Sequence, residues 1–252
     1  MDLAIRDRFT ELWQKYFNNS ELPLAFYYSK NIDHIDVSGD NASQKSVDHV
    51  CLVCNLNKVR KGESGVFGKK HINCGAGRWY AGLTEEVSSD FNYYLSCGSK
   101  GVEGERYKRD PETVNLMLDS FPHFNKKDHW LVFKRWDKLT EEDDPEVVVF
   151  FAKPNVLSGL FMLANYDFVG NAGVISPFSS GCGSITLYPY FEKDKDKPRS
   201  VIGMFDPSAR PCVGDNELTF ATPYNRLLTL MDYMEESFLI TNIWEHMKKR
   251  IK

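Results

Sequence analysis

The chain lacks the motifs that would assign a function directly. It contains no Walker A sequence, GxSxG elbow, HExxH motif or EF-hand loop. The best-known nucleotide, hydrolase, zinc-protease and calcium sites are therefore not indicated. It also lacks an excess of positive charge, with a formal net charge of −4. That balance argues against a broadly basic surface, so we expect no nucleic-acid partner.

Long hydrophobic runs are missing as well. The longest strongly apolar run covers residues 147–152, whereas a membrane-spanning helix needs roughly 20 residues. Residues 1–8 are charged and contain no apolar segment, so we expect no secretory signal. These absences predict a soluble, cytoplasmic protein with no membrane partner.

What the chain does have is enough apolar content for a packed core. Hydrophobic residues make up 42% of the 252 residues, and aromatic residues make up 13%. It also has six cysteines. In a reducing cytoplasm, we expect these to be thiols, metal ligands or catalytic groups rather than a disulfide scaffold.

Helical and extended patterns alternate along the chain. Apolar residues recur at helical spacing over residues 2–18 and 155–166, and residues 147–151 form a β-branched and aromatic run typical of a strand buried on both faces. The alternation predicts an α/β fold, in which a mixed sheet is covered by helices. We expect one domain over residues 1–252.

Two similar strand–helix–strand units suggest pseudo-duplicated halves within that domain. These halves cover about residues 20–140 and 145–252. The acidic run 141–144 lies between them, and we interpret it as a solvated connection.

Each unit ends in a Cys-Gly pair, and these pairs are the best candidates for chemistry. Cys74-Gly75 follows the apolar residues 65–67, and Cys182-Gly183 follows residues 173–175. Glycine beside a cysteine leaves backbone N–H groups open to a ligand or a thiolate. If the two units face each other, both sulfurs line one pocket. We therefore predict ligand-binding residues at Cys74, Gly75, Cys182 and Gly183.

Further residues extend this candidate site. With Cys54, or with Cys51, it would contain three or four sulfurs. Cys54, Cys74 and Cys182 are the metal-ligand candidates, for zinc or an iron–sulfur cluster. Arg210 follows a predicted strand, and at the rim of the pocket it would hold a carboxylate or phosphate. An alternative for Arg210 is a turn closed by an ion pair with Asp206.

Cys51 and Cys54 form a CxxC motif without a second one to complete a zinc ribbon. Ser46 resembles a helix N-cap, which would place both cysteines inside the following helix. We favour the interpretation that they pack into the core with Val47 and Val50, because unpaired cysteine is among the most buried residue types.

The residues therefore leave three hypotheses for function. The first is a binding protein whose cysteine-lined pocket takes a small molecule, a metal or an iron–sulfur cluster. The second is a thiol-dependent enzyme using Cys74 or Cys182, with His71 as the nearest base in sequence. The third is a structural or interaction module with buried cysteines.

The order of several short motifs resembles that of a known family. The motifs are Leu22-Pro23-Leu24-Ala25, the helix with Cys54, Cys74-Gly75 with Gly82-Leu83, the strand before Pro154, Cys182, and residues 203–210. In this order the chain resembles the uncharacterised ArCR family of bacteria and archaea, a domain of unknown function.

The resemblance covers nearly the whole chain, which implies a single domain but carries no activity. Cys54, Cys74 and Cys182 look like the family's cysteines, and residues 206–210 look like its loop. The resemblance does not extend to Cys51, Cys97 or Cys212.

Overall fold

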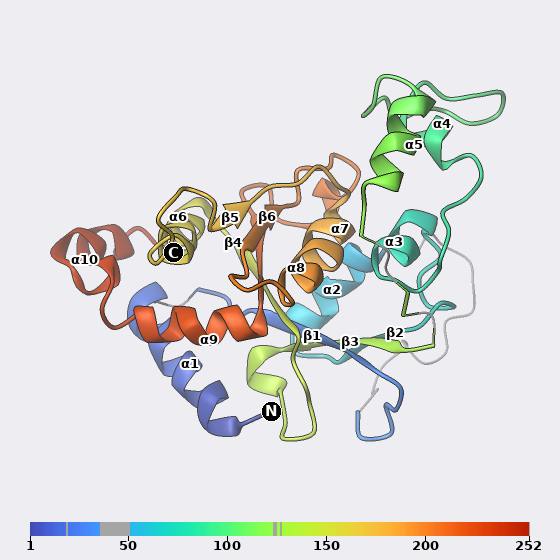
Figure 1. Ribbon diagram of the computed structural model, residues 1–252. Helices are drawn as coiled ribbons and strands as arrows, with labels where there is room; N and C mark the ends of the chain where they lie inside the picture. The colour runs from blue at the N-terminus through green and yellow to red at the C-terminus, as the bar shows by residue number, and fades with distance from the viewer. Residues whose placement is uncertain (19, 36–50, 123–124, 127, 252) are drawn as a thin grey trace.

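The computed structural model describes residues 1–18, 20–35, 51–122, 125–126 and 128–251 (Figure 1). The helices are α1 (Leu3–Phe17), α2 (Leu52–Arg60), α3 (Gly75–Tyr80), α4 (Phe91–Leu95), α5 (Pro111–Asp119), α6 (Pro154–Ala164), α7 (Gly181–Ile185), α8 (Leu187–Glu192), α9 (Tyr224–Tyr233) and α10 (Asn242–Lys248). The strands are β1 (Leu24–Ser29), β2 (Gly65–Phe67), β3 (Trp130–Arg135), β4 (Val147–Ala152), β5 (Val174–Ile175), β6 (Ser200–Gly203) and β7 (Leu218–Pro223). Short 3-10 turns add η2 (Trp136–Lys138), η3 (Arg210–Cys212) and η4 (Phe238–Ile240).

The strands form one mixed sheet in the order β2-β3-β1-β4-β7-β6-β5. Neighbouring strands are antiparallel except β5 and β6, which are parallel. Helices cover both faces of this sheet (Figure 1). The predicted α/β class with a mixed sheet is confirmed.

The centre of the sheet is buried on both faces, as the apolar run 147–151 predicts. Val147 and Val149 pack into the core on one face of β4, whereas Val148 and Phe150 pack into the core on the other. Side chains alternate along a strand, so a continuous apolar run fills both cores at once.

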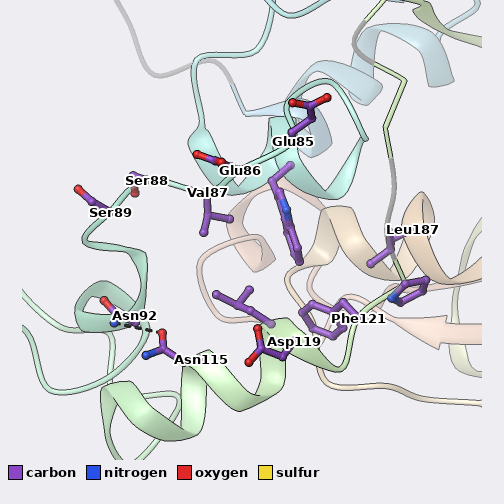
Figure 2. Close-up of a pocket in the computed structure, with 13 residues that line it drawn as sticks. Glu85, Glu86, Val87, Ser88, Ser89, Asn92, Asn115, Asp119, Phe121 and Leu187 are labelled. Carbon is purple, nitrogen blue, oxygen red and sulfur yellow. Dashed lines mark hydrogen bonds between the residues drawn. The ribbon is translucent and has the colours of Figure 1, made fainter.

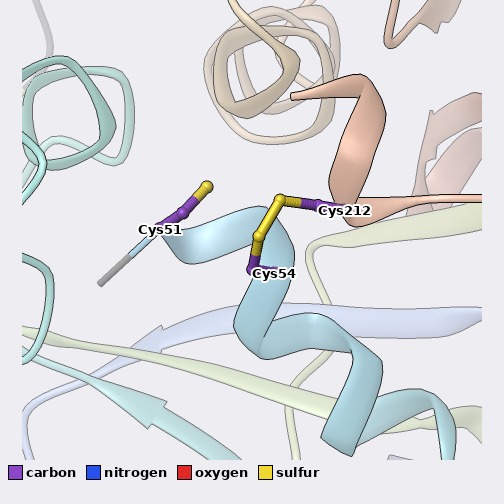
Figure 3. A group of neighbouring side chains, drawn as sticks. All are labelled: Cys51, Cys54 and Cys212. Carbon is purple, nitrogen blue, oxygen red and sulfur yellow. A yellow bond between two sulfur atoms is a disulfide. The ribbon is translucent and has the colours of Figure 1, made fainter. Parts of the chain in front are cut away.

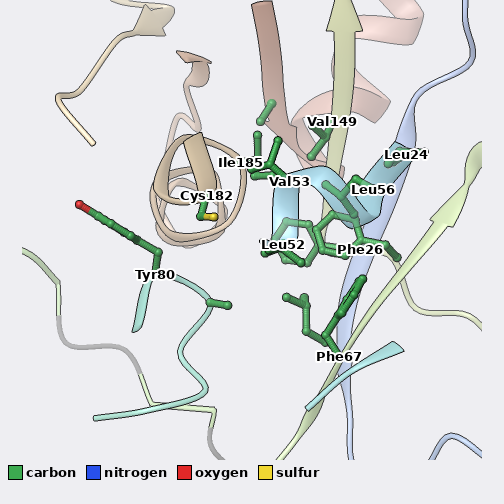
Figure 4. Packing of buried hydrophobic residues seen from close by; sticks show 14 of the residues in the cluster. Leu24, Phe26, Leu52, Val53, Leu56, Phe67, Tyr80, Val149, Cys182 and Ile185 are labelled. Carbon is green, nitrogen blue, oxygen red and sulfur yellow. The ribbon is translucent and has the colours of Figure 1, made fainter. Parts of the chain in front are cut away.

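The two cores are covered by different sets of helices. The first contains residues of α2, α3, α7 and α8, including Leu52, Tyr80 and Cys182 (Figure 4). The second contains residues of α1, α6, α9 and α10. A smaller cluster joins α4 and α5 through Phe91, Leu95 and Val114, and these two helices lie beyond α3, away from the strands (Figure 1).

The sheet continues through both predicted halves, because β1 pairs with β4. The first half contributes β1, α2, β2 and α3 in sequence, and the second contributes β4, α6, β5 and α7. However, α2 packs into the first core and α6 into the second. A common origin of the halves stays a prediction.

The acidic run 141–144 is not simply a solvated connection, so that interpretation is wrong for one of its residues. Asp143 is buried, and its carboxylate lies 2.8 Å from the ammonium of Lys134, whose side chain is 5% exposed. Tyr27 donates a hydrogen bond to the same carboxylate. A buried charge needs such partners, and no pattern within the run reveals them.

Within the described residues, no helix combines the length and the apolar character needed to cross a membrane.

Candidate functional site

A cavity of about 920 Å³ opens where segments from both halves of the chain meet. Its walls come from the starts of α2, α3 and α7, from the 88–107 segment that carries α4, and from residues 203–212 after β6. Much of the lining is apolar or aromatic, including Phe91, Phe178 and Phe205. A cavity of this size and composition is typical of a site for a small organic molecule.

Five of the six cysteines line this cavity. They are Cys51, Cys54, Cys74, Cys182 and Cys212. The sixth, Cys97, is exposed and is not among the lining residues. The sequence-based hypothesis that Cys74 and Cys182 share one pocket therefore agrees with their positions, although their role in binding stays a prediction.

Three of these sulfurs form a compact group. Cys54 and Cys212 are joined by a disulfide, with their Cα atoms 4.6 Å apart (Figure 3). The sulfur of Cys51 lies with them, and all three sulfur atoms are within 4.8 Å of one another. The expectation that the chain contains no disulfide is thus wrong for Cys54 and Cys212.

The CxxC motif lies at the start of α2 rather than inside a helix. Cys51 is the N-cap, with extended backbone angles of φ −80° and ψ 130°. Cys54 is exposed at the cavity rather than packed in the core. The predicted cap Ser46 and the predicted neighbours Val47 and Val50 lie outside the described residues. The core-packing interpretation of Cys54 is therefore wrong.

Cys74 occupies the N-cap of α3. Its sulfur accepts a hydrogen bond from the backbone N–H of Gly77 at 3.4 Å. Burial raises the pKa of the Cys74 thiol above its ordinary value, and the bond from Gly77 only partly opposes this. At neutral pH this thiol is protonated unless a metal replaces the proton.

Cys182 lies in the first turn of α7 and is 6% exposed. A hydrogen bond with Cys51, followed by burial, raises the pKa of its thiol well above the ordinary value. Cys182 lies outside the group whose sulfurs are all within 4.8 Å of one another, but it lines the same cavity as Cys51, Cys54 and Cys212. We call these four residues the cysteine cluster.

The two predicted glycines have different surroundings. Gly75 lines the cavity, and a Cβ built on it would meet nothing within 4 Å. Gly183 is not among the lining residues, and its Cβ would lie 2.6 Å from the ring of Tyr80. The absence of a side chain at Gly183 therefore serves the packing of α7 against Tyr80.

Arg210 does not face the cavity either. Its guanidinium donates to the backbone carbonyls of Gly214 at 3.0 Å, Asp215 at 2.8 Å and Glu217. Asp206, the partner of Arg210 in the alternative interpretation, does line the cavity. Its carboxylate accepts from the N–H groups of Gly181 at 3.0 Å and Ser208 at 2.8 Å.

The charge on the cavity wall is negative. Its charged side chains are Asp206 and Glu105, and none of the described lining residues is lysine, arginine or histidine. Glu105 accepts from the hydroxyl of Tyr94 at 2.8 Å. Burial, followed by a hydrogen bond with Glu105, raises the pKa of Tyr107 to about 12. A neutral or cationic occupant suits this wall better than an anion.

The wall also contains an unusual backbone conformation. Met204, directly after β6, has a φ of 71°, which few residues with side chains adopt. Its side chain is buried, 1% exposed, and lines the cavity. Such conformations concentrate at functional sites, where the surrounding structure holds them.

His71, the nearest base in sequence, is not placed to activate the thiols. It does not line the cavity, and its Nδ1 accepts from the N–H of Gly68 at 3.2 Å. Burial lowers the pKa of its imidazole.

A second hollow of about 590 Å³ lies beside Trp79 and Phe121 (Figure 2). Their ring centroids are 5.4 Å apart, and Glu85, Glu86 and Asp119 supply carboxylates to its lining. It contains no cysteine and does not include any residue that the sequence singled out.

From the sequence, Cys51 is already an alternative sulfur ligand, because the CxxC spacing places it near Cys54. Cys212 is missed, because its partner is 158 residues away in the chain and no local spacing links the two.

Together these features define a mixed α/β protein with a thiol-lined, negatively charged cavity. The sequence profile of the family described as Uncharacterised ArCR matches residues 14–232, and the chain belongs to that family. The resemblance noted in the sequence is thus confirmed. No curated protein and no solved structure gives a significant match to the chain.

Proposed function

We propose that this protein is a cytoplasmic binding protein whose cysteine cluster holds a thiophilic metal in the wall of a cavity for a small molecule. One observation carries the proposal: the sulfurs of Cys51, Cys54 and Cys212 lie within 4.8 Å of one another. Cys182, which lines the same cavity as these three residues, is the proposed fourth ligand. Four thiolates are a common ligand set for zinc and for iron–sulfur clusters.

The spacing favours a single tetrahedral ion. With zinc–sulfur bonds of about 2.3 Å, tetrahedral geometry places thiolate sulfurs roughly 3.8 Å apart. The three grouped sulfurs lie within 4.8 Å of one another, and Cys54 and Cys212 can take up that spacing only after their disulfide is broken. A cluster of several irons needs its thiolates farther apart, and Cys74 on the same wall would then be an additional ligand.

Binding requires the cluster in its reduced form. The disulfide between Cys54 and Cys212 must gain two electrons before both sulfurs can ligate a metal. The metal then displaces the thiol protons, including the one on buried Cys182. The size of the cavity leaves space for an organic ligand beside the metal, and its mostly uncharged walls suit such a ligand.

The thiol-enzyme hypothesis has weaker support. Burial raises the pKa of Cys74, and a shared hydrogen bond and burial raise that of Cys182, so neither favours a reactive thiolate. An iodoacetamide rate profile tests this hypothesis. An apparent pKa below about 8.5 at either residue would support it.

The metal proposal is tested on protein purified without oxygen and with a reductant. We expect about one equivalent of zinc, or iron with visible absorbance, measured by mass spectrometry of the metal content. Cys51→Ser and Cys182→Ser should lose most of it. Cys97→Ser is the matched control and should retain it, because Cys97 does not line the cavity.

Two results of the metal measurement would contradict the proposed metal site. Less than about one tenth of an equivalent, in reduced protein supplied with zinc and with iron and sulfide, would contradict the proposal. Equal metal content in the Cys51, Cys182 and Cys97 variants would do the same.

A further inference from the structure

Cys54 has two neighbouring sulfurs but is bonded to only one. Its disulfide partner is Cys212, and the sulfur of Cys51 lies within 4.8 Å of both sulfurs in that bond (Figure 3). All three residues line the cavity. Thiol–disulfide exchange requires access of a thiolate to a disulfide sulfur, and the sulfur of Cys51 is the neighbouring one that has it.

The position of Cys51 on α2 supports an alternative pairing. Cys51 is the N-cap and Cys54 lies three residues later, in the first turn. A CxxC pair at a helix N-terminus is an arrangement in which dithiol and disulfide forms interconvert. The sulfur of Cys51 does not cap the helix, and it lies within 4.8 Å of both sulfurs of the disulfide.

The two pairings would have different mechanical effects. The Cys54–Cys212 bond connects α2 with η3, which are 158 residues apart in sequence. A Cys51–Cys54 bond would stay within the first turn of α2 and would remove the covalent link to η3, leaving the hydrogen bond from the Asn57 amide to the Cys212 carbonyl at 2.9 Å. Both segments form part of the cavity wall, so a change of partner would remove the covalent constraint between them.

We propose that the cluster carries out internal thiol–disulfide exchange, in which Cys51 and Cys212 are alternative partners of Cys54. The proposal rests on the same cluster as the proposed metal site and adds its redox control. Cys51 loses its proton to solvent and attacks the sulfur of Cys54. The Cys54–Cys212 bond breaks, a Cys51–Cys54 bond forms, and Cys212 leaves as a thiolate that takes a proton from solvent.

The exchange itself consumes no electrons, since one disulfide replaces another. A dithiol reductant then reduces the Cys51–Cys54 bond by two electrons, and its own two thiols become a disulfide. The product is the all-thiol cluster, which alone offers Cys51, Cys54, Cys182 and Cys212 together to a metal. Reduction through Cys51 would thus control metal loading.

The test uses the full chain, stripped of metal with a chelator and oxidised without reductant. The first readout is the reactivity of Cys212 toward iodoacetamide at pH 8, followed by peptide mass spectrometry. We expect Cys212 to be alkylated at least roughly tenfold faster in the wild type than in Cys51→Ser, because only Cys51 can release it. Cys97→Ser is the matched control and should behave as the wild type.

The second readout is disulfide mapping after an acid quench. In the oxidised Cys212→Ser variant we expect a Cys51–Cys54 disulfide, and in Cys51→Ser only the Cys54–Cys212 disulfide. Cys51→Ala repeats the measurement with a different side chain, and circular dichroism of each variant confirms that it is folded.

Equal alkylation of Cys212 in the wild type and in both Cys51 variants would overturn the exchange. The absence of a Cys51–Cys54 disulfide from oxidised, folded Cys212→Ser would also overturn it. Because these assays contain no metal, their failure is distinct from the failure of the metal site. Metal in reduced protein without exchange would reject only the exchange, and exchange without metal would reject only the metal site.

Discussion

Among single residues, Asp143 is the buried charge that connects the acidic run 141–144 to strands β1 and β3 of the sheet. It pairs with Lys134 on β3, accepts from Tyr27 on β1, and accepts from the N–H of Thr140 at 2.7 Å. Burial by itself would raise the pKa of this carboxyl, but the bonds from Lys134, Tyr27 and Thr140 outweigh burial and lower it. Asp143 is therefore charged in the folded protein at neutral pH.

We expect Asp143→Asn to lower the free energy of unfolding by about 3–5 kcal/mol at pH 7, because it leaves the Lys134 ammonium buried without its counter-charge. The lowered folded-state pKa sets the pH dependence. Its stabilising contribution is present above the unfolded-state pKa of about 3.9 and disappears as the pH falls through the lower folded-state value. Urea unfolding from pH 7 to pH 3 measures it.

The neighbouring Glu142 offers a matched control, because it is exposed. Glu142→Gln should change the free energy of unfolding by less than about 0.5 kcal/mol. If Asp143→Asn changes the free energy of unfolding as little as Glu142→Gln does, the Asp143–Lys134 pair does not stabilise the fold. The same conclusion follows if the effect of Asp143→Asn stays constant down to pH 3.

At the scale of elements, the starts of α3 and α7 show why two similar sequence signals have different structural meaning. Cys74 caps α3 and Cys182 lies in the first turn of α7, and each is followed by glycine. At Gly75 the space for a Cβ is open, whereas at Gly183 the ring of Tyr80 fills it. Tyr80 is 1% exposed and belongs to the first core.

This difference predicts opposite effects of the same substitution. Gly183→Ala should destabilise the protein by about 1–3 kcal/mol, because the Tyr80 ring cannot shift without disturbing the core. Gly75→Ala should be neutral or stabilise it by about 0.5–1 kcal/mol, because alanine suits a helix and meets no neighbour.

Urea unfolding of the two variants, under identical redox conditions, compares them directly. If both substitutions shift the unfolding midpoint in the same direction and by a similar amount, the packing of α7 against Tyr80 is not the reason why position 183 requires glycine.

For the molecule as a whole, the Cys54–Cys212 disulfide closes a loop that contains most of the chain. It connects α2 in the first half with η3 in the second, across a separation of 158 residues. A cross-link over so long a loop restricts the unfolded chain strongly. The redox state of the cluster therefore affects the stability of the entire fold as well as the cavity.

We expect reduction of this disulfide to lower the free energy of unfolding by about 4–5 kcal/mol, from the loop entropy that it removes from the unfolded chain. The measurement is urea unfolding of metal-free wild type with and without reductant. Cys212→Ser should resemble the reduced wild type in both conditions, and Cys97→Ser should resemble the wild type.

A wild-type unfolding midpoint that does not change on reduction would show that the bond contributes nothing to the stability of the fold. A midpoint for Cys97→Ser that falls as far as that of Cys212→Ser would show that the effect is not specific to the bond.

The elements with strong local signals can be predicted from the amino-acid sequence alone. The helix expected at residues 2–18 is α1, Leu3–Phe17, and the apolar run 147–151 is the central strand β4, Val147–Ala152. The α/β class follows from local patterns, because helical spacing and strand alternation are encoded within a few residues. The family follows from the order of short motifs along the chain.

Which side chains contact one another depends on the tertiary fold. It brought Cys212 to Cys54, moved Cys51 to a helix N-cap beside them, buried Asp143, and turned Arg210 away from the cavity. These outcomes depend on contacts between segments that are distant in the chain, where no local periodicity or spacing carries the information. The physical reason is that burial and partner choice arise from packing the whole sheet with its helices.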